Sequence, residues 1–139
     1  MKYILQTLFA LLMPFTALAA DASAKPEDNR IITAPMPEEH LLDNKIYFFA
    51  HSMCMNCQEP FNYLMSNHRD LNIPITDMKF HHNFELYKEC VQKFNISNKE
   101  LRLPLICMGN HYIMGWDGTA PSHFEEALKD FQQTYSSAQ

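Results

Sequence analysis

KIYFFAHSMCMNC, residues 45–57, carries the strongest structural signal in this sequence. Its first six residues, from Lys45 to Ala50, form a short apolar run that is rich in aromatic and β-preferring residues. Such a run, ended by polar residues, predicts a buried β-strand. The strand leads directly to Cys54 and Cys57, two cysteines that are separated by two residues.

A helix is expected to follow these cysteines. Apolar spacing of three and four residues predicts a helix that begins near Cys54 and buries one stripe. The residues of this stripe are Phe61, Leu64, Met65 and His68. Pro60 lies inside this predicted helix and cannot donate a hydrogen bond to the carbonyl four residues earlier. We therefore expect a kink just after the cysteines.

A second strand and a second helix are expected between residues 73 and 94. Ile73 to Phe80 (IPITDMKF) is a strand candidate whose start is restricted by Pro74. Asn83 is of a residue type that caps helix N-termini, and helical spacing follows it up to a break at residues 95–98. The stripe of this second helix consists of Tyr87, Cys90, Val91 and Phe94.

A hairpin and a third helix complete the chain. Leu103 to Met108 and His111 to Trp116 are interpreted as two strands, because the two residues between them, Gly109-Asn110, suit a positive-φ turn. Ser122 and Glu125 match the S-x-x-E capping box and predict the start of the third helix. Its apolar stripe is Phe124, Ala127, Leu128, Phe131 and Tyr135.

The predicted order is strand, helix, strand, helix, strand, strand, helix, and no internal repeat is visible. Right-handed crossovers make the first two strands parallel neighbours, and the hairpin adds antiparallel strands. The expected fold class is α/β, with helices on both faces of a four-stranded mixed sheet. This is the minimal thioredoxin-like plan.

Length and composition agree with one folded domain. The chain has 139 residues, of which 47% are hydrophobic and 19% charged, so it can bury a core of ordinary density. Eleven Lys and Arg against sixteen Asp and Glu give a formal charge of −5, and no basic run is present. Nucleic acid is therefore not an expected partner.

The first twenty residues differ in composition from the rest. Lys2 precedes an almost wholly apolar run over residues 3–18, and Ala17-Leu18-Ala19 offers small residues at the spacing that signal peptidase recognises. We interpret residues 1–20 as a cleaved signal peptide. The alternative is a retained membrane anchor, although the apolar run is short of the roughly 20 residues that a membrane span needs.

Residues 21–44 contain three prolines, several charges and no sustained periodicity, which indicates a tether or a surface-hugging arm. Residues 45–139 are the predicted domain. A bacterial signal peptide of this type predicts export to the periplasm, where thiols are oxidised unless something actively reduces them. The four cysteines are thus expected to work in an oxidising compartment.

Cys54 and Cys57 are the candidate catalytic residues. At the joint between a strand and a helix, the free N–H groups and the dipole of the helix favour a thiolate, so we expect a pKa of Cys54 below that of a free thiol. Cys54 would be the nucleophile, and Cys57 would resolve the mixed disulfide. The spacing alone is moderately specific, because zinc sites and structural disulfides also use it.

IYFFAHSMCMNC resembles the active-site strand and loop of glutaredoxins, in which a Ser lies two residues before the first cysteine. The second half of the chain matches in register, with Pro104 followed by Gly109, Ile113, Gly115 and Asp117. The resemblance covers roughly Lys45 to Tyr135. It implies a glutaredoxin-like member of the thioredoxin superfamily, with a cis bond before Pro104 and that proline facing the cysteine pair. Substrate would contact Leu103 and Pro104, together with Met55 and Asn56 between the cysteines.

The sequence also departs from the family pattern. Met55-Asn56 replaces the usual Pro-Tyr, which leaves the redox potential open, and Met114 and Gly118 alter the glutathione-binding turn, which weakens the case for glutathione as a partner. Phe48 lies where thioredoxins carry a buried acid. His51 is the nearest titratable group, either as one that tunes the pKa of Cys54 or as an ordinary loop histidine.

Cys90 and Cys107 form the second candidate pair. Cys90 lies on the stripe of the second predicted helix and Cys107 on the third predicted strand, and these elements are expected to pack together. Three interpretations stay open: a structural disulfide, two buried inert thiols, or a second redox pair that relays to Cys54 and Cys57.

The sequence thus predicts a periplasmic thiol-disulfide oxidoreductase. It would act without a cofactor on cysteine-containing exported proteins and would be recharged by a membrane redox partner, in a direction that the sequence does not specify. One alternative is a copper- or zinc-binding protein that uses the reduced cysteines, because the chain is rich in Met and His. Another is a binding module that retains the fold without catalysis. No metal site is assigned.

Overall fold

The structure is a computed structural model that describes residues 35–135. The predicted signal peptide (residues 1–20), residues 21–34 of the predicted arm and residues 136–139 lie outside the described residues. The described helices and strands, with two short 3₁₀ turns (η), are β1 (Ile46–Ala50), η1 (Met55–Cys57), α1 (Gln58–Asn67), η2 (Arg69–Leu71), β2 (Ile75–Asp77), α2 (His81–Lys93), β3 (Leu105–Met108), β4 (His111–Met114) and α3 (Ala120–Tyr135).

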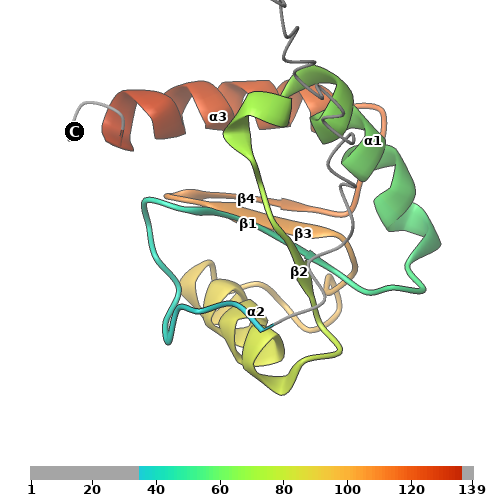
Figure 1. Ribbon diagram of the computed structural model, residues 1–139, viewed down its shortest axis with the longest axis vertical. Coiled ribbons are helices and arrows are strands. Elements are labelled where there is room, and N and C mark those ends of the chain that lie inside the picture. Colours follow the sequence, from blue (N-terminus) through green and yellow to red (C-terminus); the bar gives the residue numbers. More distant parts are fainter. Residues whose placement is uncertain (1–34, 136–139) are drawn as a thin grey trace, which may run out of the picture.

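The four strands form one mixed sheet with the order β2-β1-β3-β4. β1 is parallel to β2 and antiparallel to β3, and β4 pairs with β3 as the second arm of a hairpin. Helices α1 and α3 lie on one face of the sheet and α2 on the other (Figure 1). The predicted α/β class and the four-stranded mixed sheet are confirmed, and the arrangement is compatible with a thioredoxin-like fold.

β1 is buried along its whole length because both faces of the sheet are covered. Ile46, Phe48 and Ala50 belong to the core between the sheet and the helices α1 and α3, which we call the upper core. Tyr47 and Phe49 point the other way, into the core between the sheet and α2, which we call the lower core. A strand with aromatic residues at successive positions therefore supplies both cores, as the period of two in a strand requires.

The helix after the cysteines starts later than the sequence predicts. The 3₁₀ turn Met55–Cys57 comes first, and the α-helix begins at Gln58. Pro60 is consequently in the first turn of α1, where a backbone N–H has no partner within the helix in any case. The predicted kink assumed that Pro60 lies inside the helix, and this assumption is wrong.

The sequence predicts that Asn83 caps α2, but this prediction is wrong. The helix begins two residues earlier, at His81, and Asn83 is fully buried inside its first turn. The Asn83 side chain instead accepts a hydrogen bond from the Met36 backbone N–H (2.7 Å) and donates one to the Asp77 carbonyl (2.9 Å). The preceding strand is also shorter than predicted, since β2 ends at Asp77.

The hairpin is confirmed with shorter strands than predicted. Gly109 has a φ of +53°, whereas Asn110 does not share this positive φ. A Cβ atom at Gly109 would lie 2.8 Å from the ring of Tyr135, so the turn needs glycine for space as well as for backbone conformation. This contact places the end of α3 over the hairpin turn.

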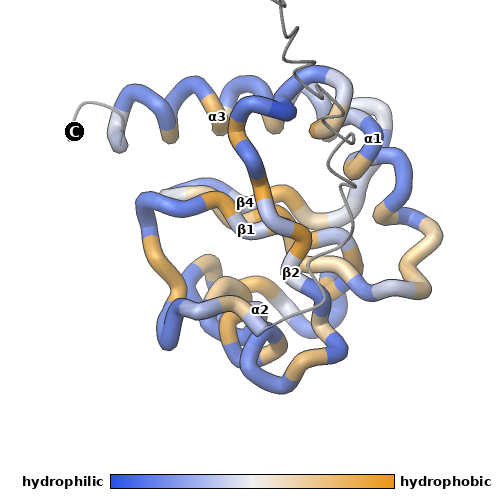
Figure 2. Tube along the Cα trace, in the orientation of Figure 1, coloured by the Kyte–Doolittle hydropathy of each residue, from blue (hydrophilic) through white to orange (hydrophobic). Residues whose placement is uncertain are grey.

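The capping-box prediction for α3 is wrong. Ser122 lies inside the first turn of the helix, which begins at Ala120. The cap is provided by Asp117, whose Oδ1 accepts hydrogen bonds from the backbone N–H groups of Thr119 (2.9 Å) and Ala120 (3.1 Å) and from the Thr119 hydroxyl. These bonds, those from Thr119 above all, hold the pKa of Asp117 below its usual range. Of the predicted apolar stripe, Phe124, Ala127 and Leu128 are buried in the upper core and Phe131 packs against it. Figure 2 shows the hydrophobic segments of α3 on its side toward the sheet.

The described part of the arm packs against α2. Met36 is buried in the lower core, and the backbone N–H of Leu41 donates to Glu89 Oε2 of α2 (2.7 Å). His82 of α2 contacts the backbone carbonyl of Glu38. None of the helices within residues 35–135 is long and apolar enough to cross a membrane.

Candidate functional site

Cys54 and Cys57 are joined in a disulfide in the segment that connects β1 to α1. Their Cα atoms are 5.4 Å apart, within the usual range for this bond. The chain turns after Ala50, and the Cys54 backbone N–H donates to the His51 carbonyl (2.8 Å). The Cys57 N–H then donates to the Cys54 carbonyl (3.2 Å), which starts the 3₁₀ turn. Both sulfurs thus lie at the N-terminal end of α1, as predicted.

The two cysteines differ in their surroundings. Cys57 is buried in the upper core, whereas Cys54 is half-buried and only packs against the edge of that core. A thiol partner from another molecule can approach the partly exposed Cys54 more easily than the buried Cys57. This difference in access agrees with Cys54 as the attacking residue and Cys57 as the resolving residue, roles that stay predictions.

Pro104 follows a cis peptide bond from Leu103, as the resemblance implies. Leu105 pairs with Phe49 in the β1–β3 register, so Pro104 lies at the level of Ala50, the last residue of β1. The carbonyl of Pro104 accepts a hydrogen bond from the Gly115 N–H (2.7 Å). Pro104 therefore occupies the same edge of the sheet from which the cysteine loop departs, and Leu103 packs against the same core as Cys54.

His51, Met55 and Asn56 all lie in this loop. The Nδ1 atom of His51 accepts a hydrogen bond from the backbone N–H of Met53 (3.2 Å), which ties the ring to its own turn. Met55 and Asn56 are exposed beside Cys54 and have no part in the core. They are placed where an approaching substrate would meet them, but their predicted role in substrate binding stays a prediction.

An aromatic cluster that the sequence analysis did not predict packs against the same upper core as Cys54. Trp116, half-buried, follows Gly115, and its ring lies 5.4 Å from that of Tyr63 on α1. The Tyr63 hydroxyl donates to Glu125 Oε1 on α3, and the Nε2 atom of His68 lies 2.6 Å from the same oxygen. The cluster joins α1 to α3. Spacing along one helix does not show which residues of separate elements lie together.

The hydrogen bond to Glu125 dominates the electrostatics of this cluster. Together with burial, it raises the pKa of Tyr63 to about 12. Burial acts to raise the pKa of Glu125, but the hydrogen bonds from Tyr63 and His68 outweigh it and hold that pKa below its usual range. The carboxylate is thus ionised and shared between two helices.

Asp77 is a buried carboxylate that the sequence analysis also missed. It lies opposite Ala50 in the β1–β2 register and is 1% exposed. Oδ1 accepts a hydrogen bond from the Lys79 backbone N–H (3.0 Å), while Oδ2 has no hydrogen bond and lies 3.5 Å from the Lys79 ammonium. The one signal for it in the sequence is an acid inside the predicted strand at residues 73–80.

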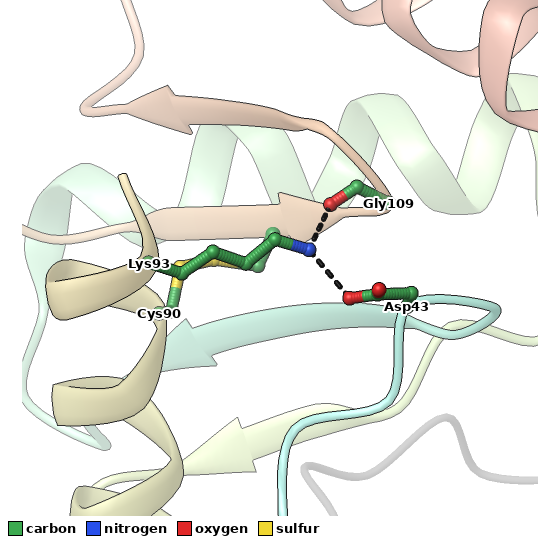
Figure 3. Close-up of a disulfide and its surroundings, with 5 residues drawn as sticks. Asp43, Cys90, Lys93 and Gly109 are labelled. Carbon is green, nitrogen blue, oxygen red and sulfur yellow. Dashed lines mark hydrogen bonds and ion pairs between the residues drawn. A yellow bond between two sulfur atoms is a disulfide. The ribbon is translucent and has the colours of Figure 1, made fainter. Parts of the chain in front are cut away.

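Cys90 and Cys107 are bonded to each other on the far side of the sheet. Their Cα atoms are 6.5 Å apart, they are 0% and 3% exposed, and both belong to the lower core. Beside this disulfide, the Lys93 ammonium of α2 donates hydrogen bonds to the Asp43 carboxylate and to the Gly109 carbonyl, with N–O distances of 2.5 Å in both cases (Figure 3). The sheet separates this bond from Cys57 in the upper core, which argues against a relay between the pairs.

Within residues 35–135, no group of three or more His, Cys, Asp or Glu side chains is arranged to hold a metal ion. Comparisons of the chain with protein-family models, with curated proteins and with solved structures give no significant match. The chemistry at the site is that of its own residues: a partly exposed cysteine bonded to a buried one, with a cis-proline peptide at the same end of the sheet. Such a pair can exchange disulfides with a thiol or disulfide that reaches Cys54.

Proposed function

We propose that this protein is an exported, glutaredoxin-like member of the thioredoxin superfamily that exchanges disulfides with other exported proteins in the periplasm. The resemblance in sequence and the compatible fold support the family assignment. The apolar run at residues 3–18 supports export.

The observation that carries the proposal is the disulfide at the end of β1. Cys54 is accessible and Cys57 is buried behind it, so the pair has one entrance for a substrate sulfur. The cis peptide before Pro104 lies at the same edge of the sheet and supplies backbone next to that entrance. A purely structural disulfide would have no need for an accessible sulfur.

Reduction of a substrate disulfide proceeds in two exchanges. The Cys54 thiolate attacks one substrate sulfur, a mixed disulfide forms, and the other substrate sulfur leaves as a thiolate. The Cys57 thiolate then attacks the Cys54 sulfur, which releases the second substrate thiol and closes the Cys54–Cys57 disulfide. Two electrons pass from the cysteine pair to the substrate. Oxidation of a substrate dithiol is the same sequence in reverse.

Either direction needs a second redox partner, because one turnover leaves the pair in the opposite state. A membrane protein that donates or accepts two electrons would restore it. Which direction operates depends on the stability of the Cys54–Cys57 disulfide relative to that of the substrate.

The test uses single serine variants in a Cys90→Ser/Cys107→Ser background, so that only the proposed active pair remains. Cys57→Ser is expected to accumulate a mixed disulfide on Cys54 with a cysteine-containing substrate protein, visible as a mass increase that a reductant reverses. Cys54→Ser is expected to accumulate none. The proposal fails if Cys54→Ser exchanges with a model disulfide at the rate of the parent protein.

A further inference from the structure

The most exposed large apolar side chains of residues 35–135 lie on either side of Cys54. Met53 is 82% exposed and Met55 is 91% exposed. The other exposed large hydrophobic residues of the described chain, Leu42, Phe84 and Tyr112, are 40–44% exposed and lie elsewhere. Single exposed apolar residues are ordinary on protein surfaces. Here, however, the two most exposed ones lie directly before and after Cys54.

The loop that carries these methionines has no charged residue of the Lys, Arg, Asp or Glu type. After Lys45, the next such residue in the chain is Glu59, beyond both cysteines. His51 is engaged by the backbone N–H of Met53, and Leu103 is half-buried at the same edge of the sheet. A substrate that reaches Cys54 therefore meets apolar and neutral side chains on this loop.

Methionine suits a surface that must accept many shapes, because its side chain is unbranched, flexible and polarisable. Cysteines of folded proteins are among the most buried residues, so apolar neighbours commonly surround them. Those neighbours are accessible together with the cysteine only while the chain is unfolded. The chemistry of the loop thus fits a non-native chain better than the polar surface of a folded protein.

We propose that Met53 and Met55 bind the apolar side chains that flank a cysteine in an extended, unfolded segment of a newly exported protein. This inference rests on the proposed function and adds its substrate class. Contact with the two methionines holds the substrate cysteine next to Cys54 while the first exchange takes place. The apolar neighbours then leave with the substrate, and the methionines return to solvent.

The experiment compares two peptides of equal length whose single cysteine carries thionitrobenzoate as a mixed disulfide. In one peptide Leu and Phe flank the cysteine, and in the other two Ser residues do. Attack by the reduced Cys54 thiolate joins its sulfur to the peptide sulfur and releases coloured thionitrobenzoate. The second-order rate constant is measured for the full mature protein, with 2-hydroxyethyl disulfide as a small substrate that lacks flanking residues.

The reduced protein is expected to react about tenfold faster with the apolar peptide than with the polar one. The Met53→Gln/Met55→Gln variant, of similar length and neutral charge, is expected to lose this preference. Met53→Leu/Met55→Leu should retain it, and so should Leu42→Gln, which changes an exposed apolar residue in the arm.

Two outcomes distinguish a wrong substrate class from a wrong proposed function. If the protein reacts with the small disulfide but shows equal rates with the two peptides, the substrate class proposed here is wrong while the exchange function stands. If it reacts with none of the three, the proposed function itself is wrong. A stable dimer in sedimentation that only the glutamine variant abolishes would also overturn the inference, because the methionines would then cover a second copy of the chain.

Discussion

Cys57 and Cys107 are buried on opposite faces of the same sheet. Cys57 belongs to the core beneath α1 and α3, and Cys107 to the core beneath α2. Cys107 lies at a β3 position whose neighbours, Ile106 and Met108, point into the core of Cys57. The two disulfides are therefore separated by a layer of strands, and they are expected to behave as independent bonds.

Replacing Cys90 and Cys107 together by serine should weaken the fold without stopping exchange. The bond closes a segment with a sequence separation of 17 residues, for which the loss in unfolding free energy is about 3 kcal/mol. Urea unfolding of the oxidised proteins measures this loss. Thionitrobenzoate release by Cys54, measured well below the unfolding midpoint, should stay within about twofold of the parent rate. A tenfold slower release would show that the pairs are coupled.

Asn83→Ala should destabilise the protein by about 2–3 kcal/mol, because two buried hydrogen bonds are lost and their backbone partners are left without a replacement. Those partners are the Met36 N–H and the Asp77 carbonyl. The matched control is Asn62→Ala, the same substitution at an exposed position of α1, with an expected change within about 0.5 kcal/mol. Equal midpoints in urea for the two variants would contradict the bridging role of Asn83.

Glu125→Gln should lower stability at pH 7 by less than about 1 kcal/mol, because the carboxylate is nearly half exposed and solvent screens its interactions. The pKa of Glu125 is lower in the folded protein than its ordinary value of 4.5. Its contribution is therefore complete above that value and is lost as the pH falls through the folded pKa. The unfolding free energies of the two proteins should converge in acid. A difference that persists at pH 2 would mean that the ionised carboxylate is not its cause.

Removing metal should leave disulfide exchange unchanged. Exchange by Cys54 and Cys57 needs only the two sulfurs, so treatment with EDTA and with a copper(I) chelator is expected to have no effect on the rate. Metal analysis before and after treatment provides the control. A protein that carries stoichiometric copper or zinc and cycles only once that metal has been stripped would favour the metal-binding alternative over exchange.

The central part of the fold could be predicted because its signals are local. The run from Lys45 to Ala50 is apolar at every position from 46 onward, which suits a strand covered on both faces. The hairpin likewise follows from Gly109, whose positive φ a side chain would oppose. Both features depend on residues adjacent in the sequence, and the pattern therefore contains the information.

The helix starts were mispredicted for a different reason. Asn83 is a good capping residue by type, but its side chain bonds a backbone group 47 positions earlier in the chain. Asp117, three residues before Ala120, provides the cap of α3 in place of Ser122. Likewise, α1 begins at Gln58, a few residues later than predicted, so Pro60 lies in its first turn and not in its interior. Each side chain had two structural uses: a tertiary contact selected between them for Asn83, whereas the cap by Asp117 is local to the start of α3.

The sequence predicted the position of the cysteine pair and of the cis bond in the candidate site, but not their surroundings. Cys54, Cys57 and the cis bond before Pro104 follow from a motif and a resemblance. The carboxylate of Asp77 and the link between Tyr63 and Glu125 depend on which strands and helices lie side by side. Spacing along one helix or strand contains no such information.

The most direct test of the central claim is the reduction potential of the Cys54–Cys57 couple. The oxidised protein is equilibrated in glutathione buffers, its free thiols are alkylated, and each cysteine is quantified by peptide mass spectrometry. We predict that Cys54 and Cys57 change together as one two-electron couple between about −270 and −120 mV, while Cys90 and Cys107 stay bonded. A pair at Cys54 and Cys57 that stays oxidised, or stays reduced, over this whole range would contradict the account.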